Sequence, residues 1–425
     1  MIVSYRRVRR GYLRPLLLVL GFLFLIDAIY LIRGRPYTQR THLTPDRRSP
    51  ASPSGNTTVF IVSVHRNTEE IQRQSWNNAV LDLVDYLGAG NVHFSAVESG
   101  SQENTKEALT DLKAALDERG VSNTVSLGMT VWEQLEEIDT RPSPEGPREP
   151  GWIWNKAENQ YELRRIPYLS KVRNQAMEPL QQLEAEGRYF DKVLWLNDVV
   201  FDTEDIITLF NTRNGDYAAA CSMDYKSPPL YYDTFALRDD LGLKTASLHW
   251  PWFQSPRARE SAWRGEPIRV SSCWNGIVAF DAAPFYGDNQ TRLRFRGIDD
   301  SLADFHLEGS ECCLIHADNY LAAEKGIWLN PSVRVGYDVA AYRAVRRSAS
   351  GRFPGAFWAV VGAWVNRVNG WHISLQVSLE ARTVQGRLER WVAETPRGEF
   401  PRYEPGQACL INEMQIMWSN GWKHL

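Results

Sequence analysis

Short apolar runs alternate with segments of helical apolar spacing from residue 59 onward, and this alternation constrains the fold more than any other feature. The runs 59–64, 92–97 and 192–196 have the length and β-branched content of buried strands. Residues 121–127 form a weaker strand and residues 217–223 another strand. Between them, apolar residues recur every three or four positions, and Gly88 and Gly120 mark helix ends. The sequence therefore predicts an α/β fold with a mostly parallel sheet and helices on both faces.

Ligands of such sheets bind outside the carboxyl ends of the strands. The loops after Val64, Val97, Leu196 and Met223 are therefore the predicted site. Residues 225–340 are rich in Trp and Pro and would form the acceptor side. Residues 346–425 contain short strand-like runs and are interpreted as a C-terminal extension of undefined structure.

The N-terminus predicts a membrane anchor. Residues 15–32 are apolar except for Asp27, and as a helix they would cover about 27 Å, enough for a thin bilayer. Five arginines precede this run, namely Arg6, Arg7, Arg9, Arg10 and Arg14. Positively charged residues that flank a membrane span stay on the cytoplasmic side. We expect a cytoplasmic tail (1–14), a signal anchor (15–32), a stem (33–57) and a lumenal folded domain (58–345). The alternative is a cleaved signal peptide.

Charge and cysteine content narrow the function. A net charge of −3 gives no nucleic-acid signature. The five cysteines lack CxxC spacing, which disfavours a zinc site, and an oxidising lumen would allow two disulfides with one free thiol. The sequons at Asn56 and Asn289 fit the lumen. Asp27 is costly inside a membrane, so we expect it near the lumenal end or paired with another chain.

A carboxylate follows the strand at 192–196, in Asn197-Asp198. Departure of a nucleoside diphosphate requires its charge to be neutralised, and a hard divalent cation held by carboxylate oxygens does this. Asp198 is the predicted ligand. Asp202, four residues further on, could assist in binding the cation, but it also fits a helix cap. The alternative to a cation site is therefore a plain turn at Asp198 followed by a helix cap.

Other polar residues follow the first two strands or lie on a predicted helix. Glu98 could hold a ribose or a base. His65, Arg66 and Arg173 could face a diphosphate, which suits the planar fork of arginine. Each of these signals is also typical of turns and surface charges.

Two further segments carry candidate sugar contacts. Trp274 and Asn275 precede a predicted strand and adjoin Gly276. This glycine could allow the backbone to approach a ligand closely, or it could simply form the turn that enters the strand. Segment 308–318 holds three carboxylates and a histidine: Glu308, Glu311, Asp318 and His316. Glu311 could act as a base or bind an acceptor hydroxyl, and His316 could bind a cation or a phosphate.

Absent motifs and competing functions limit the assignment. The chain has no Walker A loop, GxGxxG after a strand, GxSxG or HExxH. The carboxylates of segment 308–318 would also allow a glycoside hydrolase that uses two of Glu308, Glu311 and Asp318. Another alternative is a non-catalytic subunit of a polysaccharide-synthesising complex.

Several ordered segments resemble the fungal capsule-associated glycosyltransferases typified by cryptococcal α-1,3-mannosyltransferase. They are VFIVSVHRN, AVESGSQENT, SKVRNQAMEPL, VLWLNDVVF, AACSMDY, SSCWNGIVAF and GSECCLIHAD. The resemblance implies a GT-A-like (Rossmann-like) fold, a GDP-mannose donor, a carbohydrate acceptor and a divalent cation of the Mn²⁺ type. It also implies α-1,3 transfer with retention, and the anchor then predicts a single-pass type II protein of the Golgi membrane with a lumenal catalytic domain.

The same resemblance assigns roles to residues. Asn197 and Asp198 stand at a divergent Asp-x-Asp position, with Glu98 and Arg173 near the nucleotide. The residues that the resemblance places near the sugars are Trp274, Asn275 and Glu311. The polar segment 308–318 adds Glu308 as a further candidate for binding the acceptor. Glu311 and Asp198 are the predicted catalytic residues, and Asp198 and His316 the predicted metal ligands. Another nucleotide-sugar donor is the alternative.

Overall fold

The structure is a computed structural model that describes all residues except 1, 35–56, 289–290, 347–352 and 420. Asn56, Asn289 and most of the predicted stem lie outside the described residues. The helices are α1 Ile2–Gly34, α2 Glu69–Ile71, α3 Asn77–Leu87, α4 Thr105–Glu118, α5 Val131–Asp139, α6 Arg165–Ala185, α7 Thr203–Phe210, α8 Pro256–Arg264, α9 Asp300–Ala303, α10 Glu311–Ala317, α11 Val339–Arg346 and α12 Ala356–Ala393. The strands are β1 Val59–His65, β2 Val92–Glu98, β3 Ser122–Leu127, β4 Trp152–Asn155, β5 Gln160–Leu163, β6 Lys192–Leu196, β7 Ala219–Tyr225, β8 Arg238–Asp239, β9 Ile268–Ser272, β10 Ile277–Asp281, β11 Glu308–Gly309, β12 Ile327–Gly336, β13 Leu410–Ile411, β14 Gln415–Trp418 and β15 Gly421–His424.

A nine-stranded sheet in the order β3-β2-β1-β6-β10-β7-β12-β9-β8 forms the centre of the domain. The β1 strand pairs in parallel with β2 and β6, β2 with β3, and β7 with β12. The β10 strand is antiparallel to both β6 and β7. Consequently β1, β2, β3, β6, β7 and β12 all point the same way, which confirms the predicted mostly parallel α/β sheet.

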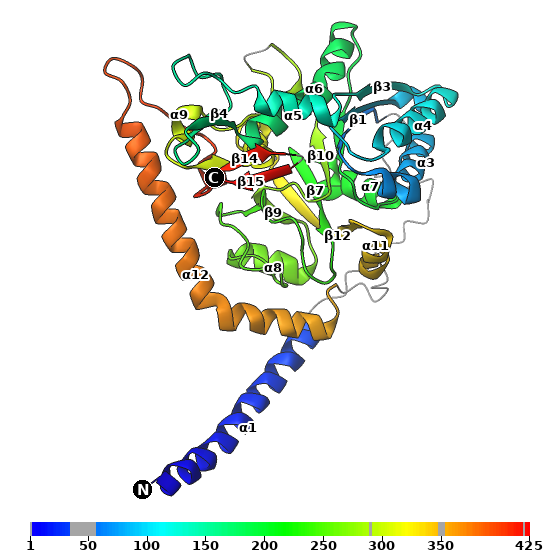
Figure 1. Cartoon of the computed structure of the whole chain (residues 1–425). Helices are drawn as coiled ribbons and strands as arrows, with labels where there is room; N and C mark the ends of the chain where they lie inside the picture. Colours follow the sequence, from blue (N-terminus) through cyan, green and yellow to red (C-terminus); the bar gives the residue numbers. More distant parts are fainter. Residues whose placement is uncertain (1, 35–56, 289–290, 347–352, 420) are drawn as a thin grey trace.

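Alternation along the strands builds a core on each face of the sheet. Phe60 and Val62 of β1 pack toward α6, whereas Val59 and Ile61 pack toward α3 and α4. This is the two-residue period of a strand whose both faces are covered. Figure 1 shows the same layers, with α3 and α4 beside β1 and β3 and α6 across the sheet.

The C-terminal region differs from the strand-like extension expected for residues 346–425. Most of it is the 38-residue helix α12, and only β13, β14 and β15 are strands. The β13 strand pairs with β11, and Ile416 bridges to Arg164 at the start of α6. The C-terminal segment therefore completes the domain.

Disulfides link distant parts of this domain. Cys221 of β7 is bonded to Cys273, and Cys313 of α10 to Cys409, while Cys312 is a buried free thiol. This matches the expected two bridges and one thiol, and it supplies the pairing that the sequence does not define.

The α1 helix projects from the domain beside the beginning of α12 (Figure 1). Its stretch Arg14–Leu31 is long and apolar enough to cross a membrane. Asp27 forms an ion pair with Arg367 of α12, with N–O distances of 2.5 and 3.1 Å. The carboxylate in the apolar run is thus paired within its own chain.

Candidate active site

The common direction of the strands brings polar residues to one edge of the sheet. Glu98 ends β2, Asp198 follows β6, Asp224 lies near the end of β7 and Tyr337 follows β12. Because β10 runs the opposite way, the loop before it, which contains Asn275, starts at the same edge. The predicted ligand-facing edge is therefore where these side chains gather.

Gly276 holds three strands close together at this edge. Its backbone has a φ of +81°, and the amide of Asn197 donates to its carbonyl at 3.0 Å. A Cβ at this position would lie 2.6 Å from Cγ2 of Val335 and 3.3 Å from Cβ of Asp224. Only glycine fits this conformation and this space without displacing its neighbours.

The hydroxyl of Tyr337 bonds to one aspartate of this edge and is influenced by the charges of two others. This hydroxyl donates to Oδ2 of Asp224 at 2.9 Å, and the amide of Asp233 donates to Oδ1 of Asp224 at 3.2 Å. Burial and the carboxylates of Asp224, Asp233 and Asp198 together raise the pKa of Tyr337 above its ordinary value. Asp198 and Asp233 remain partly exposed, so the cluster is open to a ligand.

The electrostatics of this carboxylate cluster fit a hard cation. Burial raises the pKa of Asp198 to about 6 and that of Asp233 to about 6. Burial and the neighbouring Asp233 raise the pKa of Asp224 well above its ordinary range. The carboxylates of Asp224 and Asp233 repel one another when both are ionised, and a divalent cation with oxygen ligands would relieve that repulsion. Asp198, Asp224 and Asp233 are the residues that would hold it.

An arginine and a glutamate adjoin the carboxylate cluster. Nε of Arg173 donates to Oε1 of Glu311 at 3.0 Å, and Arg173 lies 4.6 Å from the centre of the Trp274 ring. The charges of Glu311, Arg173 and Arg165 all act on Asp233, which places them around the same space. This arrangement sets guanidinium groups beside a cation-binding carboxylate cluster, which suits a diphosphate.

Trp274 and Asn275 support this site from beneath. Trp274 is almost completely buried under Arg173 and packs 5.3 Å from the Trp195 ring. The side-chain amide of buried Asn275 donates to the carbonyl of Asp233. The structure therefore places both residues at the site, as positioning groups for Arg173 and Asp233.

A second polar group occupies the β1–β2 end of the same edge. Glu98 is fully buried, accepts from the Ser101 amide at 2.7 Å and lies 3.4 Å from Nζ of Lys106. Arg66 lies close enough to Glu98 and Tyr168 for both to raise its pKa, although burial lowers that pKa overall. The predicted nucleotide role of Glu98 and Arg66 stays a prediction.

Three predicted site residues lie instead in the interior, where they are engaged by other protein groups. The ring nitrogens of His65 contact Thr68 and Gln72 on one side and Ser63 on the other, at 2.9–3.1 Å, and burial lowers the pKa of His65 to about 3. A histidine so enclosed has no nitrogen left for a nucleotide.

Glu308 and His316 are likewise enclosed. Glu308 receives two bonds from Arg164, at 2.7 and 3.1 Å, and both side chains are completely buried. Nε2 of His316 bonds to the carbonyl of Cys273 at 2.7 Å, and its ring stacks on Phe280. The structure brings neither residue to the carboxylate cluster, so Glu308 is not placed to touch an acceptor and His316 is not placed to bind a cation there.

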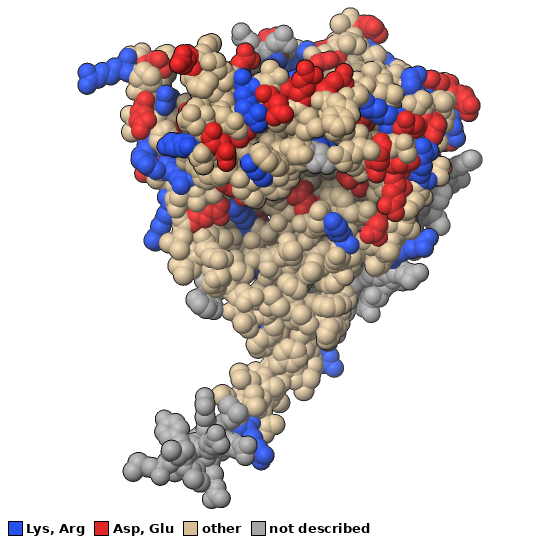
Figure 2. All heavy atoms as spheres, in the orientation of Figure 1, with Lys and Arg blue, Asp and Glu red and all other residues tan. Residues whose placement is uncertain are grey.

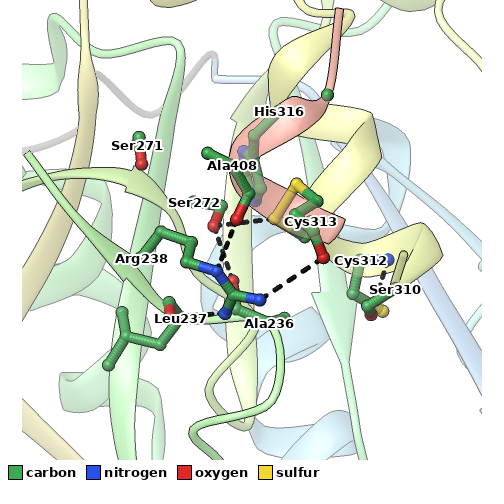
Figure 3. Close-up of a disulfide and its surroundings, with 12 residues drawn as sticks. Ala236, Leu237, Arg238, Ser271, Ser272, Ser310, Cys312, Cys313, His316 and Ala408 are labelled. Atoms are coloured by element: carbon green, nitrogen blue, oxygen red, sulfur yellow. Dashed lines mark hydrogen bonds between the residues drawn. A yellow bond between two sulfur atoms is a disulfide. The ribbon is translucent and has the colours of Figure 1, made fainter. Parts of the chain in front are cut away.

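Figure 3 shows His316 beside the Cys313 disulfide, at the other end of α10 from Ser310. The sulfurs of Cys221 and Cys273 also lie within 4.8 Å of its nitrogen. Those two sulfurs are bonded to each other and are therefore not thiolate ligands. The His316 environment is structural.

The sequence prediction missed Asp224, Asp233, Tyr337 and Arg165. Asp224 carried the same signal as Asp198, because it follows the apolar run 217–223. Asp233 and Tyr337 come from irregular segments, and Arg165 begins a helix, so no periodic signal marked them.

The carboxylates of segment 308–318 do not form a hydrolase pair. Asp318 receives two bonds from Arg296, at 2.6 and 2.9 Å, while Glu308 is held by Arg164. Of the three, only Glu311 adjoins the site, and a hydrolase requires two carboxyl groups that flank the sugar.

The chain is similar to known mannosyltransferases. The family described as Cryptococcal mannosyltransferase 1 matches residues 58–318. The α-1,3-mannosyltransferase CMT1 of Cryptococcus neoformans var. neoformans is 26% identical over 323 residues, which cover 70% of this chain and 63% of that protein. The matched region thus spans less than two thirds of the length of this relative.

Solved structures give weaker likenesses. The mannosyltransferase PcManGT from Pyrobaculum calidifontis, in complex with GDP-Man and Mn²⁺, is 11% identical with a TM-score of 0.37, over 88% of this chain and 83% of that one. TarS 1–349 of S. aureus, in complex with UDP, is 11% identical with a TM-score of 0.38, over 79% and 83%. Their TM-scores are too low for an argument about this site. The family match covers more than half of the chain, and the chain belongs to the cryptococcal mannosyltransferase 1 family.

Proposed function

We propose that this protein transfers mannose from GDP-mannose to a mannoside acceptor, forming an α-1,3 linkage with retention and using Mn²⁺. One observation carries the proposal: Asp198, Asp224 and Asp233 converge at the ligand-facing sheet edge beside Arg173 and Glu311. Membership of the mannosyltransferase family supports the sugar that is moved.

The acidic and basic residues of the site have different proposed roles. A divalent cation on the three aspartates would neutralise the departing diphosphate. Arg173 and Arg165 lie beside the cluster and would bind phosphate oxygens by planar, paired bonds. Arg173 is pre-oriented by its bond to Glu311 and by the Trp274 ring, so little ordering is needed when the donor binds.

Glu311 is the carboxylate we assign to the reacting sugars. It is the first residue of α10, and Ser310 caps that helix through the Cys312 amide. Its Oε1 accepts a bond from Nε of Arg173, which holds the carboxylate beside the aspartates of the sheet edge. An ionised carboxylate can accept a proton from an acceptor hydroxyl or stabilise positive charge on the donor sugar.

We further propose that the protein is a type II glycoprotein of the Golgi membrane. The arginine-rich tail, the apolar stretch Arg14–Leu31 and the two disulfides support an anchor with a lumenal domain.

The Asp198→Asn variant tests the proposal. Transfer from GDP-mannose to an α-mannoside should fall by about 10²–10³-fold, because a charge that stabilises the departing diphosphate is lost. Asp202→Asn is the matched control, since Asp202 caps α7 through the Asp205 amide at 3.1 Å and asparagine caps equally well. Unchanged transfer by Asp198→Asn would refute the role of the cluster.

A donor screen separates the remaining alternatives. With GDP-, UDP- and CMP-sugars and Mn²⁺, only the GDP-mannose reaction should proceed. Activity with another donor alone would reassign the sugar. A non-catalytic subunit would support polysaccharide synthesis equally well when it carries the Asp198→Asn substitution.

A further inference from the structure

One stripe along the exposed side of α12 is apolar. Phe357, Val368, Leu375 and Leu379 are each between 52% and 69% exposed. Their spacing of eleven, seven and four residues places them on one stripe of a helix with 3.6 residues per turn. From residue 356 to residue 379, Arg367 is the only residue charged at neutral pH. A helix face this apolar in contact with water indicates an interaction surface.

The opposite side of α12 is fixed to the domain, so the apolar stripe cannot turn inward. The side-chain amide of Asn366 donates to the carbonyls of His249 and Trp250, both at 3.2 Å. A Cβ on Gly362 would lie 2.5 Å from the Trp250 carbonyl oxygen, which shows how closely the backbones approach. Further along, Lys244 forms an ion pair with Glu380 at 2.6 Å.

The apolar stripe continues from the predicted membrane span. The rings of Phe24 in α1 and Trp364 in α12 lie 5.5 Å apart, and Asp27 pairs with Arg367. Figure 1 shows α12 beginning beside the end of α1, passing below α8 and then bending upward. Figure 2 shows that the part of the domain nearest α1 is almost free of charged side chains on this face, whereas the rest is covered with them.

We propose that the segment 356–379 of α12 lies on the membrane that α1 crosses, with Phe357, Val368, Leu375 and Leu379 inserted at the boundary between headgroups and acyl chains. The partner is thus a lipid bilayer surface. Polar residues such as Asn366, which bonds to the domain, keep this segment at the interface. The inference rests on α1 being the anchor.

Two attachment points then define the position of the domain. One span alone would leave the domain free to tilt on the membrane. A helix lying in the interface and joined to the span by the Asp27–Arg367 pair fixes its tilt and its height. An acceptor attached to the same membrane would meet the sheet edge at a set distance.

The test uses the full chain in phosphatidylcholine vesicles with an NBD fluorophore on single introduced cysteines. Val368→Cys and Leu375→Cys probe the stripe, and Leu20→Cys probes the exposed apolar part of α1. Gln385→Cys, an exposed position beyond the stripe, is the matched control. The wild-type chain controls for labelling of buried Cys312.

Doxyl-labelled lipid should quench the probes at 368 and 375 to an extent comparable with the probe at 20, and aqueous iodide should quench only the probe at 385. Quenching at 20 but iodide access at 368 and 375 would overturn the inference and leave the anchor intact. Shielding of 368 and 375 from both quenchers would also overturn it, because a protein would then cover the stripe. Absence of lipid quenching at 20 would refute the anchor itself.

Discussion

At the residue scale, the acidic side chains near α10 fall into two kinds. Glu308 is buried and neutralised by Arg164, and Asp318 is paired with Arg296. Asp198, Asp224 and Asp233 lie instead at the sheet edge, where burial raises the pKa of each and the Asp233 charge further raises that of Asp224. Carboxylates whose charge is disfavoured at an open edge are typical of functional sites.

Variants of Glu308 and Glu311 distinguish a structural carboxylate from one that acts in the reaction. Glu311→Gln should lower transfer per folded molecule by about 10²–10³-fold, because the carboxylate that orients Arg173 at the site is lost. It should also lower the unfolding free energy, since Glu311 is buried and pairs with Arg173. Glu308→Gln removes one of the two carboxylate partners of the buried Arg164 guanidinium and leaves Asp300 at 2.6 Å. It should cost about 1–3 kcal/mol of unfolding free energy, with activity per folded molecule kept. Melting curves and initial rates distinguish them, and the reverse pattern would contradict the assignment.

The buried histidines make stability depend on pH. Burial lowers the pKa of His93 to about 4 and that of His316 to about 4. Between those values and the unfolded pKa of about 6.5, the unfolded chain binds more protons, so stability falls as pH drops from about 6.5. Each histidine should remove about 2 kcal/mol between pH 7 and pH 5.

The His93→Gln variant isolates one of these contributions. Its unfolding free energy should start lower at pH 7, because the ring contacts with Ser122 and Phe60 are lost, and should then fall less steeply toward pH 5 than that of the wild type. Denaturant titrations at both pH values measure the slope. Parallel curves for variant and wild type would show that His93 does not titrate across folding.

At the element scale, the strands that the sequence predicted share one property, an apolar run buried on both faces. That signal located β1, β2, β6 and β7 and hence the site edge. It could not give the direction of β10, because strand direction depends on pairing with β6 and β7 across more than fifty residues of chain. The antiparallel register brings Asn275 to the site edge, where its side-chain amide donates to the carbonyl of Asp233. Its predicted contact with a sugar stays a prediction.

The α12 helix was misjudged for a different reason. Its sequence from 357 to 377 is rich in Val, Trp and Phe, which favour strands by local propensity. The helix forms because the domain pins Gly362 and Asn366 and buries Val360 and Ala363. Tertiary packing overrides local propensity here, and a single sequence does not reveal that packing.

The Cys313–Cys409 bridge should hold the C-terminal segment onto α10. The double variant Cys313→Ala/Cys409→Ala opens a link between residues 96 positions apart and should cost about 2–5 kcal/mol. Amide exchange should accelerate in β13 and β14 and change little in β1, which lies in the centre of the sheet. Cys312→Ala, which breaks no crosslink, is the control. Unaltered exchange in β13 would contradict this role.

At the scale of the whole molecule, the arginine-rich end and the disulfides support the proposed lumenal orientation of the domain. The arginine-rich end includes the start of α1, and the disulfides lie in the domain that follows this helix. Asp27, the only acidic residue of the span, lies near the C-terminal end of α1 and is paired with Arg367 of α12. Each feature arises from a different physical cause: loop charge, redox compartment and ion pairing within one chain.

Protease protection in sealed microsomes tests that orientation. Added protease should leave the domain from residue 58 onward intact until detergent is present, because the membrane separates the two. Replacing Arg6, Arg7, Arg9 and Arg10 by Gln should yield a mixed population, since the charge difference that orients α1 is reduced. Digestion of the wild-type domain without detergent would place the carboxylate cluster on the cytoplasmic side. The two disulfides could then not persist, because cytosolic thiols keep cysteines reduced.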